Sequence, residues 1–264
     1  MSIVLAILAK DKAHCLPLYL QCIYNQTFPK KKIHLYIRTN DNSDNTAQIL
    51  HAYIQDNGHK YASVFYDDTD ISSDLKRYKQ HEWNPYRFKL LGKLRQESID
   101  YAKRLQADYF VADCDNFIVP NVLETFFALR EFGVVAPMLM THFEYSNFHY
   151  EVNANGYMKS CPQYWDLLKQ SIKGVTIVPV VHCTYYIHEK HLSNICYDDS
   201  TKRHEYVIFS ETLRKQNIDQ YLDNRRFYGF LVFSETKEEL EALIESKWKH
   251  MIETEFSNGH TNVA

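Results

Sequence analysis

Glycine and proline are scarce in this chain of 264 residues, which contains seven of each. A collagenous chain, a long flexible linker or a low-complexity disordered segment needs far more of both, so the composition predicts a chain that is folded throughout. Neither GxGxxG nor GxxxxGKS/T occurs, which argues against dinucleotide-binding and P-loop functions. The remaining composition, 45% hydrophobic and 24% charged, is typical of a soluble globular protein with a sizeable core.

Long apolar runs, an excess of either charge and paired cysteines are also missing. The longest apolar run, residues 3–9, is far short of the ~20 residues that span a bilayer, and it lacks the basic flank of a signal peptide. Lysine and arginine total 30 against 33 aspartates and glutamates, so overall charge gives no reason to expect nucleic acid as a partner. The six cysteines contain no CxxC pair and no export leader is recognised, so we expect free thiols and a cytoplasmic protein. The short apolar runs predict no transmembrane segment.

Segments with the patterns of strands and helices alternate through the first half of the chain. Residues 3–9 are nearly continuous in apolar side chains, as in a central parallel strand that helices cover on both faces. Strands are predicted at residues 3–9, 33–37, 64–66, 109–112 and 134–138, and helices at residues 16–24, 47–54, 87–104 and 120–129. This alternation predicts an α/β fold with an open, mostly parallel, doubly wound sheet flanked by helices.

The second half is less regular, and one stretch of the first half has no clear period. Residues 67–83 are polar and charged and are expected to form a surface loop, and residues 145–165 are aromatic and loop-like. Residues 175–181 are strongly strand-like, and helices are expected at residues 206–216 and 237–252. No repeat or shift in composition marks a linker, so we predict a single domain over residues 1–264.

Polar side chains follow two of the predicted strands, at the edge where open α/β sheets bind ligands. Thr39, Asn40 and Asp41 could hydrogen-bond a base or ribose, or could belong to an ordinary capped helix start. Asp113 and Asp115 directly follow a buried strand. Residues i and i+2 of an extended chain point the same way, so both carboxylates could face one hard cation that phosphate oxygens bridge. The alternative for these two acids is a solvated turn.

Five blocks of sequence carry a resemblance to a known family. They are Asp44-Asn45-Thr46, residues 107–116, residues 134–139, Tyr145-Ser146-Asn147-Phe148 and residues 178–182. In these blocks the chain resembles the amino-terminal domain of the procollagen galactosyltransferases, in glycosyltransferase family 25, which implies the GT-A fold. On this resemblance residues 1–140 form a nucleotide-sugar-binding half, residues 141–236 an acceptor-side half, and residues 237–264 a C-terminal helix and tail.

The resemblance implies an inverting hexosyltransferase that moves galactose or glucose from a UDP-sugar to a hydroxyl acceptor, either a hydroxylysine-like protein side chain or a glycan. It also implies Mn²⁺ or Mg²⁺ at Asp113 and Asp115, which match the family's DXD motif, with His182 completing the coordination and Asp113 also close to the ribose. Such an ion stabilises the negative charge that grows on the leaving diphosphate. For His182 the alternative is a buried structural histidine.

Further site residues follow from the same resemblance. Arg95 matches a basic position that would contact the phosphates, although an arginine on a helix is usually solvated, and Asn116 and Asn147 are assigned to substrate binding. Glu205 is the candidate base for the acceptor hydroxyl; the family has paired acids here, and His204 replaces the first of them. Glu205 could instead only stabilise a helix N-terminus. The alternative function is a non-catalytic sugar-nucleotide or carbohydrate-binding domain of the same fold.

Overall fold

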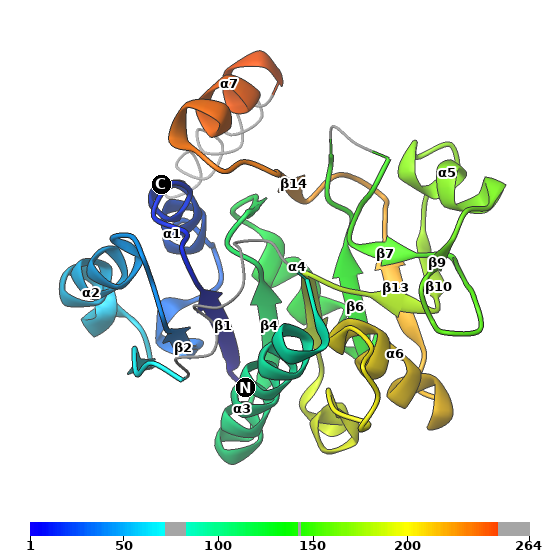
Figure 1. Cartoon of the computed structure of the whole chain (residues 1–264), viewed down its shortest axis with the longest axis horizontal. Helices are drawn as coiled ribbons and strands as arrows, with labels where there is room; N and C mark the ends of the chain where they lie inside the picture. The colour runs from blue at the N-terminus through cyan, green and yellow to red at the C-terminus, as the bar shows by residue number, and fades with distance from the viewer. Residues whose placement is uncertain (72–82, 142–143, 248–264) are drawn as a thin grey trace.

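The computed structural model describes residues 1–71, 83–141 and 144–247 (Figure 1). The strands are β1 (Ile3–Ala9), β2 (Ile33–Thr39), β3 (Ser63–Asp67), β4 (Asp108–Ala112), β5 (Asn116–Ile118), β6 (Val134–Pro137), β7 (Phe148–His149), β8 (Glu151–Val152), β9 (Met158–Lys159), β10 (Val175–Val178), β11 (Val180–Val181), β12 (Thr184–Ile187), β13 (Gln220–Asp223) and β14 (Gly229–Leu231). The α-helices are α1 (Leu16–Tyr24), α2 (Thr46–Asn57), α3 (Pro85–Leu105), α4 (Val122–Ala128), α5 (Pro162–Leu168), α6 (Glu205–Lys215) and α7 (Lys237–Lys247). Most of the predicted loop 67–83 and the end of the predicted helix 237–252 lie outside the described residues.

Eight strands form one mixed sheet in the order β10, β13, β6, β12, β4, β1, β2, β3. β1 pairs in parallel with β2 and β4, β2 with β3, and β6 with β13. Two strands run the other way, because β12 is antiparallel to both β4 and β6, and β10 is antiparallel to β13. The sheet is open and mostly parallel, which confirms the predicted fold class.

Helices cover both faces of this sheet (Figure 1). Successive side chains of a strand point to opposite faces. Ile3, Leu5 and Ile7 of β1 therefore join a core with residues of α1, α2 and α4, while Val4 and Ala6 join a second core with residues of α3, α5 and α6. All five are fully buried, which explains why this strand is a continuous apolar run in the sequence.

Two stretches of the second half differ from the prediction. Residues 175–181 form two strands in different sheets, because Pro179 separates them and has no N–H group to donate to a neighbouring strand. Residues 145–165 are only partly loop, since they contain the short strands β7, β8 and β9 and the first turn of α5. α5 begins at Pro162, whose fixed φ suits the first turn of a helix.

The sequence pattern does not predict β12, although this strand lies in the middle of the sheet. Two adjacent tyrosines, Tyr185 and Tyr186, break the apolar pattern that identifies the other central strands. Tyr186 donates its hydroxyl to the buried carboxylate of Asp108, and the hydroxyls of Tyr185 and Tyr197 are hydrogen-bonded to each other. A buried hydroxyl is tolerated when it has a hydrogen-bond partner, and each of these phenols has one. Tyrosines can therefore occupy β12, which lies between β6 and β4 in the sheet.

Three further features bear on the sequence predictions. Strands of both predicted halves are interleaved in one sheet, since β6 lies between β12 and β13. All six cysteines are free thiols, as predicted. In the part of the chain that the structure describes, no helix combines the length and apolarity that crossing a bilayer requires.

Candidate active site

Three loops meet at the carboxyl ends of β1, β2 and β4, the edge at which open α/β sheets bind ligands. Backbone N–H groups hold the loop after β1 to the loop after β2: Lys12 donates to Oγ1 of Thr46 at 2.7 Å, and Ala13 donates to Oδ2 of Asp44 at 2.9 Å. The side chain of Lys12 also reaches the loop after β4, where its Nζ lies 3.0 Å from Oδ2 of Asp115. The three loops therefore form one polar surface.

The predicted nucleotide-binding residues Thr39, Asn40 and Asp41 end β2 and begin the second of these loops. Thr39 Oγ1 accepts a hydrogen bond from Asn42 Nδ2 at 2.7 Å, and Asn40 Nδ2 donates to Asp41 Oδ2 at 2.8 Å. Asp41 adopts a left-handed backbone with φ of 48°, which aspartate tolerates better than most residues. These contacts order the loop, and nucleotide binding by the three residues stays a prediction.

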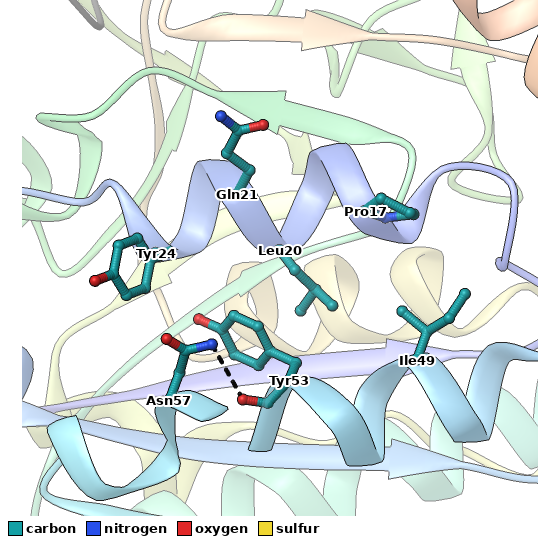
Figure 2. A pocket seen from close by; sticks show the side chains of 7 residues that line it. All are labelled: Pro17, Leu20, Gln21, Tyr24, Ile49, Tyr53 and Asn57. Carbon is teal, nitrogen blue, oxygen red and sulfur yellow. Dashed lines mark hydrogen bonds between the residues drawn. The ribbon is translucent and has the colours of Figure 1, made fainter. Parts of the chain in front are cut away.

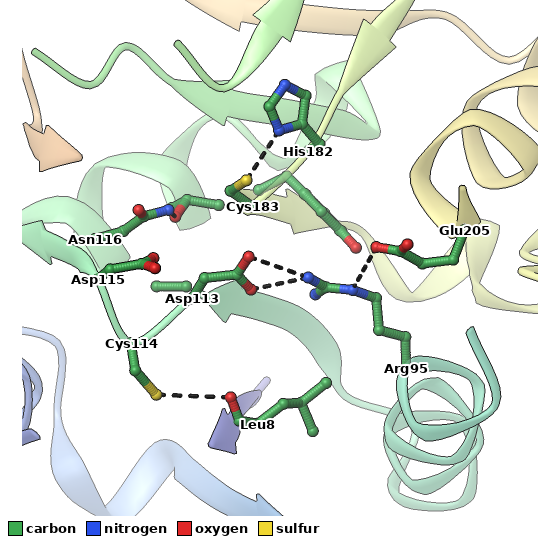
Figure 3. A network of polar contacts seen from close by, with 12 residues as sticks. Leu8, Arg95, Asp113, Cys114, Asp115, Asn116, His182, Cys183 and Glu205 are labelled. Atoms are coloured by element: carbon green, nitrogen blue, oxygen red, sulfur yellow. Dashed lines mark hydrogen bonds and ion pairs between the residues drawn. The ribbon is translucent and has the colours of Figure 1, made fainter. Parts of the chain in front are cut away.

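Asp113 and Asp115 are each paired with a cation that comes from another part of the fold, and Figure 3 shows the pair of Asp113 and Arg95. Nη2 of Arg95 on α3 donates to both carboxylate oxygens of Asp113, at 2.8 and 3.2 Å. Lys12 donates to one oxygen of Asp115. The structure thus brings the two acids to the predicted edge of the sheet, and each has a counter-charge there.

Arg95 also binds Glu205, with Nε of the guanidinium 3.2 Å from Oε1. Only 4% of the surface of Arg95 is exposed. Burial alone would lower the pKa of Arg95, but Asp113 and Glu205 together with neighbouring groups hold this pKa well above its usual range. The reading of Arg95 as a solvated residue on a helix surface is therefore wrong, because the arginine lies between two acids.

Glu205 is the first residue of α6, and both oxygens of its buried carboxylate accept hydrogen bonds. Oε1 accepts from Arg95, and Oε2 is bonded to Nδ1 of His204. Burial alone would raise the pKa of Glu205, but the hydrogen bond and charge of His204 and the charge of Arg95 lower it below its ordinary value. Glu205 is therefore an ionised carboxylate held at two points.

The close approach of α3 and α6 depends on Gly92. A Cβ atom at this position would lie 2.9 Å from the backbone oxygen of Tyr197 and 3.3 Å from Cβ of Glu205. Arg95 is three residues further along α3 and so lies on the same face of that helix. The missing side chain of Gly92 is what allows Arg95 to reach Glu205.

His182 is buried and lies next to Cys183, on the side away from Asp113 in Figure 3. Its Nδ1 lies 2.9 Å from Sγ of Cys183, and its Nε2 has no hydrogen-bond partner within the described chain. Its ring packs on those of Tyr145 and Tyr206, with centroids 5.2 and 4.9 Å away. Burial lowers the pKa of His182 well below its usual range, so the imidazole is neutral. A metal-binding role for it stays a prediction.

Asn116 and Asn147 are both buried and both fix the start of β12. Nδ2 of Asn116 donates to Oγ1 of Thr184 at 2.7 Å, and Nδ2 of Asn147 donates to the carbonyls of Pro137 and Thr184 at 2.8 and 3.2 Å. Oδ1 of Asn116 is buried and has no partner among the described residues. Substrate binding by the two asparagines stays a prediction, and this oxygen is the acceptor that Asn116 still offers.

The carboxylates at this edge of the sheet could hold a divalent cation only together with oxygen atoms of a bound ligand. Across residues 1–71, 83–141 and 144–247 no three histidine, cysteine, aspartate or glutamate side chains are arranged to hold a metal ion. Asp115 is 26% exposed at its side chain, and only its Oδ2 is hydrogen-bonded within this part of the chain. Mg²⁺ and similar ions are usually held by one or two carboxylates together with substrate phosphates, so Asp115 suits an ion that arrives with a diphosphate.

Two residues of the site were not assigned a role from the sequence. Lys12 lies three residues after β1, and inspecting the loop after every predicted strand would have found it. His204 was noted only as a substitution for an acid, and its contact with Glu205 joins adjacent residues. Each is bonded to an acid that the sequence already indicated, Lys12 to Asp115 and His204 to Glu205.

One cavity of about 350 Å³ lies elsewhere, in a groove between α1 and α2 (Figure 2). Its lining is mainly apolar and includes Leu20, Ile49 and Tyr53. None of the acids and cations described above lines it. This groove is separate from the candidate active site.

The mixed sheet, its helical layers and the acidic turn after β4 define the class of GT-A glycosyltransferase folds. The solved structure of S. aureus TarS 1–349 in complex with UDP-GlcNAc aligns with a TM-score of 0.57 and 15% identity, covering 89% of this chain and 59% of that chain. Residues 1–250 match the N-terminal domain of glycosyltransferase family 25, and the chain belongs to this family. The family resemblance that the sequence blocks suggested is confirmed.

The chain is also similar to named proteins of the same family. Procollagen galactosyltransferase 1 of Danio rerio is 27% identical over 95% of this chain and 44% of its own length, and procollagen galactosyltransferase 2 of Homo sapiens is 28% identical over 96% and 42%. Inactive glycosyltransferase 25 family member 3 of Mus musculus is 27% identical over 87% and 40%. The chain thus spans less than half the length of each of these relatives.

Proposed function

We propose that this chain transfers a hexose, galactose or glucose, from a UDP-sugar to a hydroxyl acceptor with inversion at the anomeric carbon. The observation that carries the proposal is the pair of acids at the end of β4, which meets the loops after β1 and β2 and is linked through Arg95 to Glu205. This arrangement supplies a place for a nucleotide diphosphate and, beyond Arg95, a carboxylate for the acceptor side. The names of the galactosyltransferase relatives support a galactosyl donor.

Each part of the site has a separate task in this reaction. The loop that contains Thr39, Asn40 and Asp41 takes the base and ribose, and Asp115 holds Mn²⁺ or Mg²⁺ with Asp113 beside it. When bound, such an ion stabilises the negative charge of the leaving UDP. Lys12, already paired with Asp115, adds positive charge at the same place.

The acceptor side comprises Glu205 and the aromatic residues around it. The acceptor is a hydroxyl group, on a hydroxylysine-like side chain or on a glycan, and the carboxylate of Glu205 takes up its proton. The procollagen relatives support the protein side chain over the glycan. We place the reaction in the cytoplasm, where the six free thiols would stay reduced.

The experiment that tests this function measures UDP binding, and UDP release from UDP-galactose and UDP-glucose, each with Mn²⁺ or with EDTA. The Asp115→Ala variant is compared with Asp100→Ala, which removes an exposed acid of α3. Metal-dependent release from one donor, lost in Asp115→Ala and kept in Asp100→Ala, supports the proposal and identifies the sugar. Absence of UDP binding under every condition would refute it.

A second function has its own supporting observation. The mouse relative is called inactive, and in this chain His204 occupies the place of the family's first acid, so a sugar-nucleotide or carbohydrate-binding domain without turnover is the alternative. Under that alternative the chain binds UDP with its metal yet releases none from either donor, with a hydroxylysine peptide or an oligosaccharide present. The same assay with these acceptors therefore separates the two functions.

A further inference from the structure

The carboxylate of Glu205 is poorly placed to receive a proton from an acceptor itself. Its side chain is 3% exposed, and each of its oxygens already accepts a hydrogen bond. Arg95 occupies one oxygen and is fixed in turn by Asp113. Since so little of the side chain is exposed, an acceptor hydroxyl has almost no open route to the lone pairs that remain on Glu205.

His204 is the partner of Glu205 that does reach the surface. Its side chain is 20% exposed, and Nδ1 is bonded to Oε2 of Glu205. Among the described residues its Nε2 makes no hydrogen bond. The imidazole therefore has one nitrogen fixed by a buried carboxylate and the other available to a ligand.

The orientation of the His204 ring is fixed by packing as well. Ring centroids of Phe88, Tyr206 and Trp83 lie 4.3, 4.6 and 5.2 Å from that of His204. The backbone N–H of His204 donates to the hydroxyl of Tyr157 at 3.1 Å. Packing on three rings and the hydrogen bond to Glu205 hold the imidazole in one direction, and the bond to Tyr157 holds the backbone that carries it. A positioned proton acceptor requires such a fixed orientation.

We infer that Nε2 of His204 is the atom that accepts the proton of the acceptor hydroxyl, and that Glu205 is its positioning residue. This inference rests on the proposed function and replaces a carboxylate base with a carboxylate–imidazole pair. As the acceptor oxygen forms its bond to the anomeric carbon, the bond from that carbon to the diphosphate breaks and UDP leaves with the electron pair. The hydroxyl proton moves to Nε2, and the imidazolium, stabilised by Glu205, later releases it to water.

Other charged and titratable groups face this pair from the packed elements. Arg95 approaches from α3, Tyr157 from the turn between β8 and β9, Tyr206 from α6, and His182 from the loop before β12. Arg95 contacts Glu205 and not the imidazole, so it keeps the carboxylate ionised while His204 stays the group next to solvent. The division of tasks follows from which side chain is exposed.

The test measures kcat for UDP-galactose with a hydroxylysine-containing peptide as acceptor, together with the affinity for UDP. We expect His204→Gln to lower kcat by about 100-fold or more and to change UDP affinity by less than about threefold. The exposed His59→Gln serves as the matched control and should behave as the wild type. His204→Glu should recover part of the lost kcat and move the acidic limb of the pH profile to lower pH, because carboxylic acids ordinarily titrate about two pH units below histidine.

The outcomes separate this inference from the function on which it rests. If His204→Gln keeps kcat within about threefold of the wild type with the same acidic limb, His204 is not the base and the inference is overturned while the transferase function stands. If the wild type transfers neither galactose nor glucose, to the peptide or to an oligosaccharide, both are overturned. If Glu205→Gln lowers kcat as His204→Gln does and the double variant is no worse than either, the two residues act as one unit, as inferred.

Discussion

Arg95 and Glu205 are 110 positions apart in sequence, and the guanidinium of the first is hydrogen-bonded to the buried carboxylate of the second at 3.2 Å. The same guanidinium binds Asp113 through Nη2. Because one arginine joins the acid of the proposed donor side to the acid of the proposed acceptor side, the two sides of the site are fixed relative to each other. This contact gives Arg95 a structural role in the site.

Removing this arginine should destabilise the fold. Arg95→Met leaves the buried carboxylate of Glu205 and the adjacent Asp113 without their shared cation, a loss of about 3–5 kcal/mol in the free energy of unfolding by analogy with other buried pairs. Urea unfolding measures it, with the exposed Arg104→Met as control. A further substitution, Glu205→Gln, should restore part of the loss, and equal stability of Arg95→Met and wild type would contradict the structure.

Gly92→Ala tests the contact between α3 and α6. In an open helix interior this substitution stabilises by about 1 kcal/mol. Here the added methyl group meets a backbone oxygen at 2.9 Å, so we expect a destabilisation of about 1–3 kcal/mol and a loss of transferase activity. Gly58→Ala is the matched control, because its Cβ would make only ordinary contacts at 3.4 Å. Thermal unfolding of the two variants should change in opposite directions or by clearly different amounts.

His149 should make the folded state sensitive to acid. Burial, with a smaller effect of Arg214, lowers the pKa of His149 to about 4 from an ordinary value of 6.5. Between these two values the unfolded chain binds a proton that the folded chain does not, so the free energy of unfolding falls as the pH falls from 6.5 towards 4. His149→Phe should remove up to about 3 kcal/mol of this dependence.

Urea unfolding between pH 7 and 4 measures that slope. The exposed His51→Phe serves as control and should leave the slope unchanged. His182, which is also buried and neutral, contributes in the same direction, so a residual slope in His149→Phe is expected. A slope as steep as that of the wild type would show that His149 is not protonated on unfolding.

Substitution of Asp108 should lower the stability of the fold and leave UDP affinity unchanged. It begins β4, at the opposite end of that strand from Asp113, and binds Arg130 at 3.2 Å and the backbone N–H of Glu189 at 2.8 Å. Asp108→Asn breaks a buried charged pair, so we expect a loss of about 3 kcal/mol in unfolding free energy. UDP affinity, measured by calorimetry where the variant is folded, should equal that of the wild type. A selective loss of UDP binding would place Asp108 in the site.

Local pattern was enough to predict most of the first half of the fold. The helix at residues 16–24 has the predicted bounds, because its apolar face repeats every three or four residues and Pro17 and the segment after Tyr24 delimit it. β1 was evident for a similar reason, since both of its faces are buried. The acids after β4 were also predictable, because their place depends only on where one strand ends.

The antiparallel strand β12 was beyond the reach of pattern. Its tyrosines become compatible with a buried position only through Asp108 and Tyr197, which are distant in sequence or in another element. The break at Pro179 could not be predicted from the pattern either. It depends on β10 and β11, the strands on each side of Pro179, pairing in two different sheets. Contacts of this kind are fixed by packing, and a single sequence contains no record of them.

The sequence by itself therefore determined the α/β alternation, the family and the location of Asp113 and Asp115, because each is a property of consecutive residues. Only the tertiary structure decided which side chains meet them. It placed Arg95 between Asp113 and Glu205, gave Asp115 to Lys12, and left His204 at the surface of the pair that it forms with Glu205. The contact of Arg95 with Glu205 depends on how closely α3 packs against α6, and the absence of a side chain at Gly92 permits that short distance.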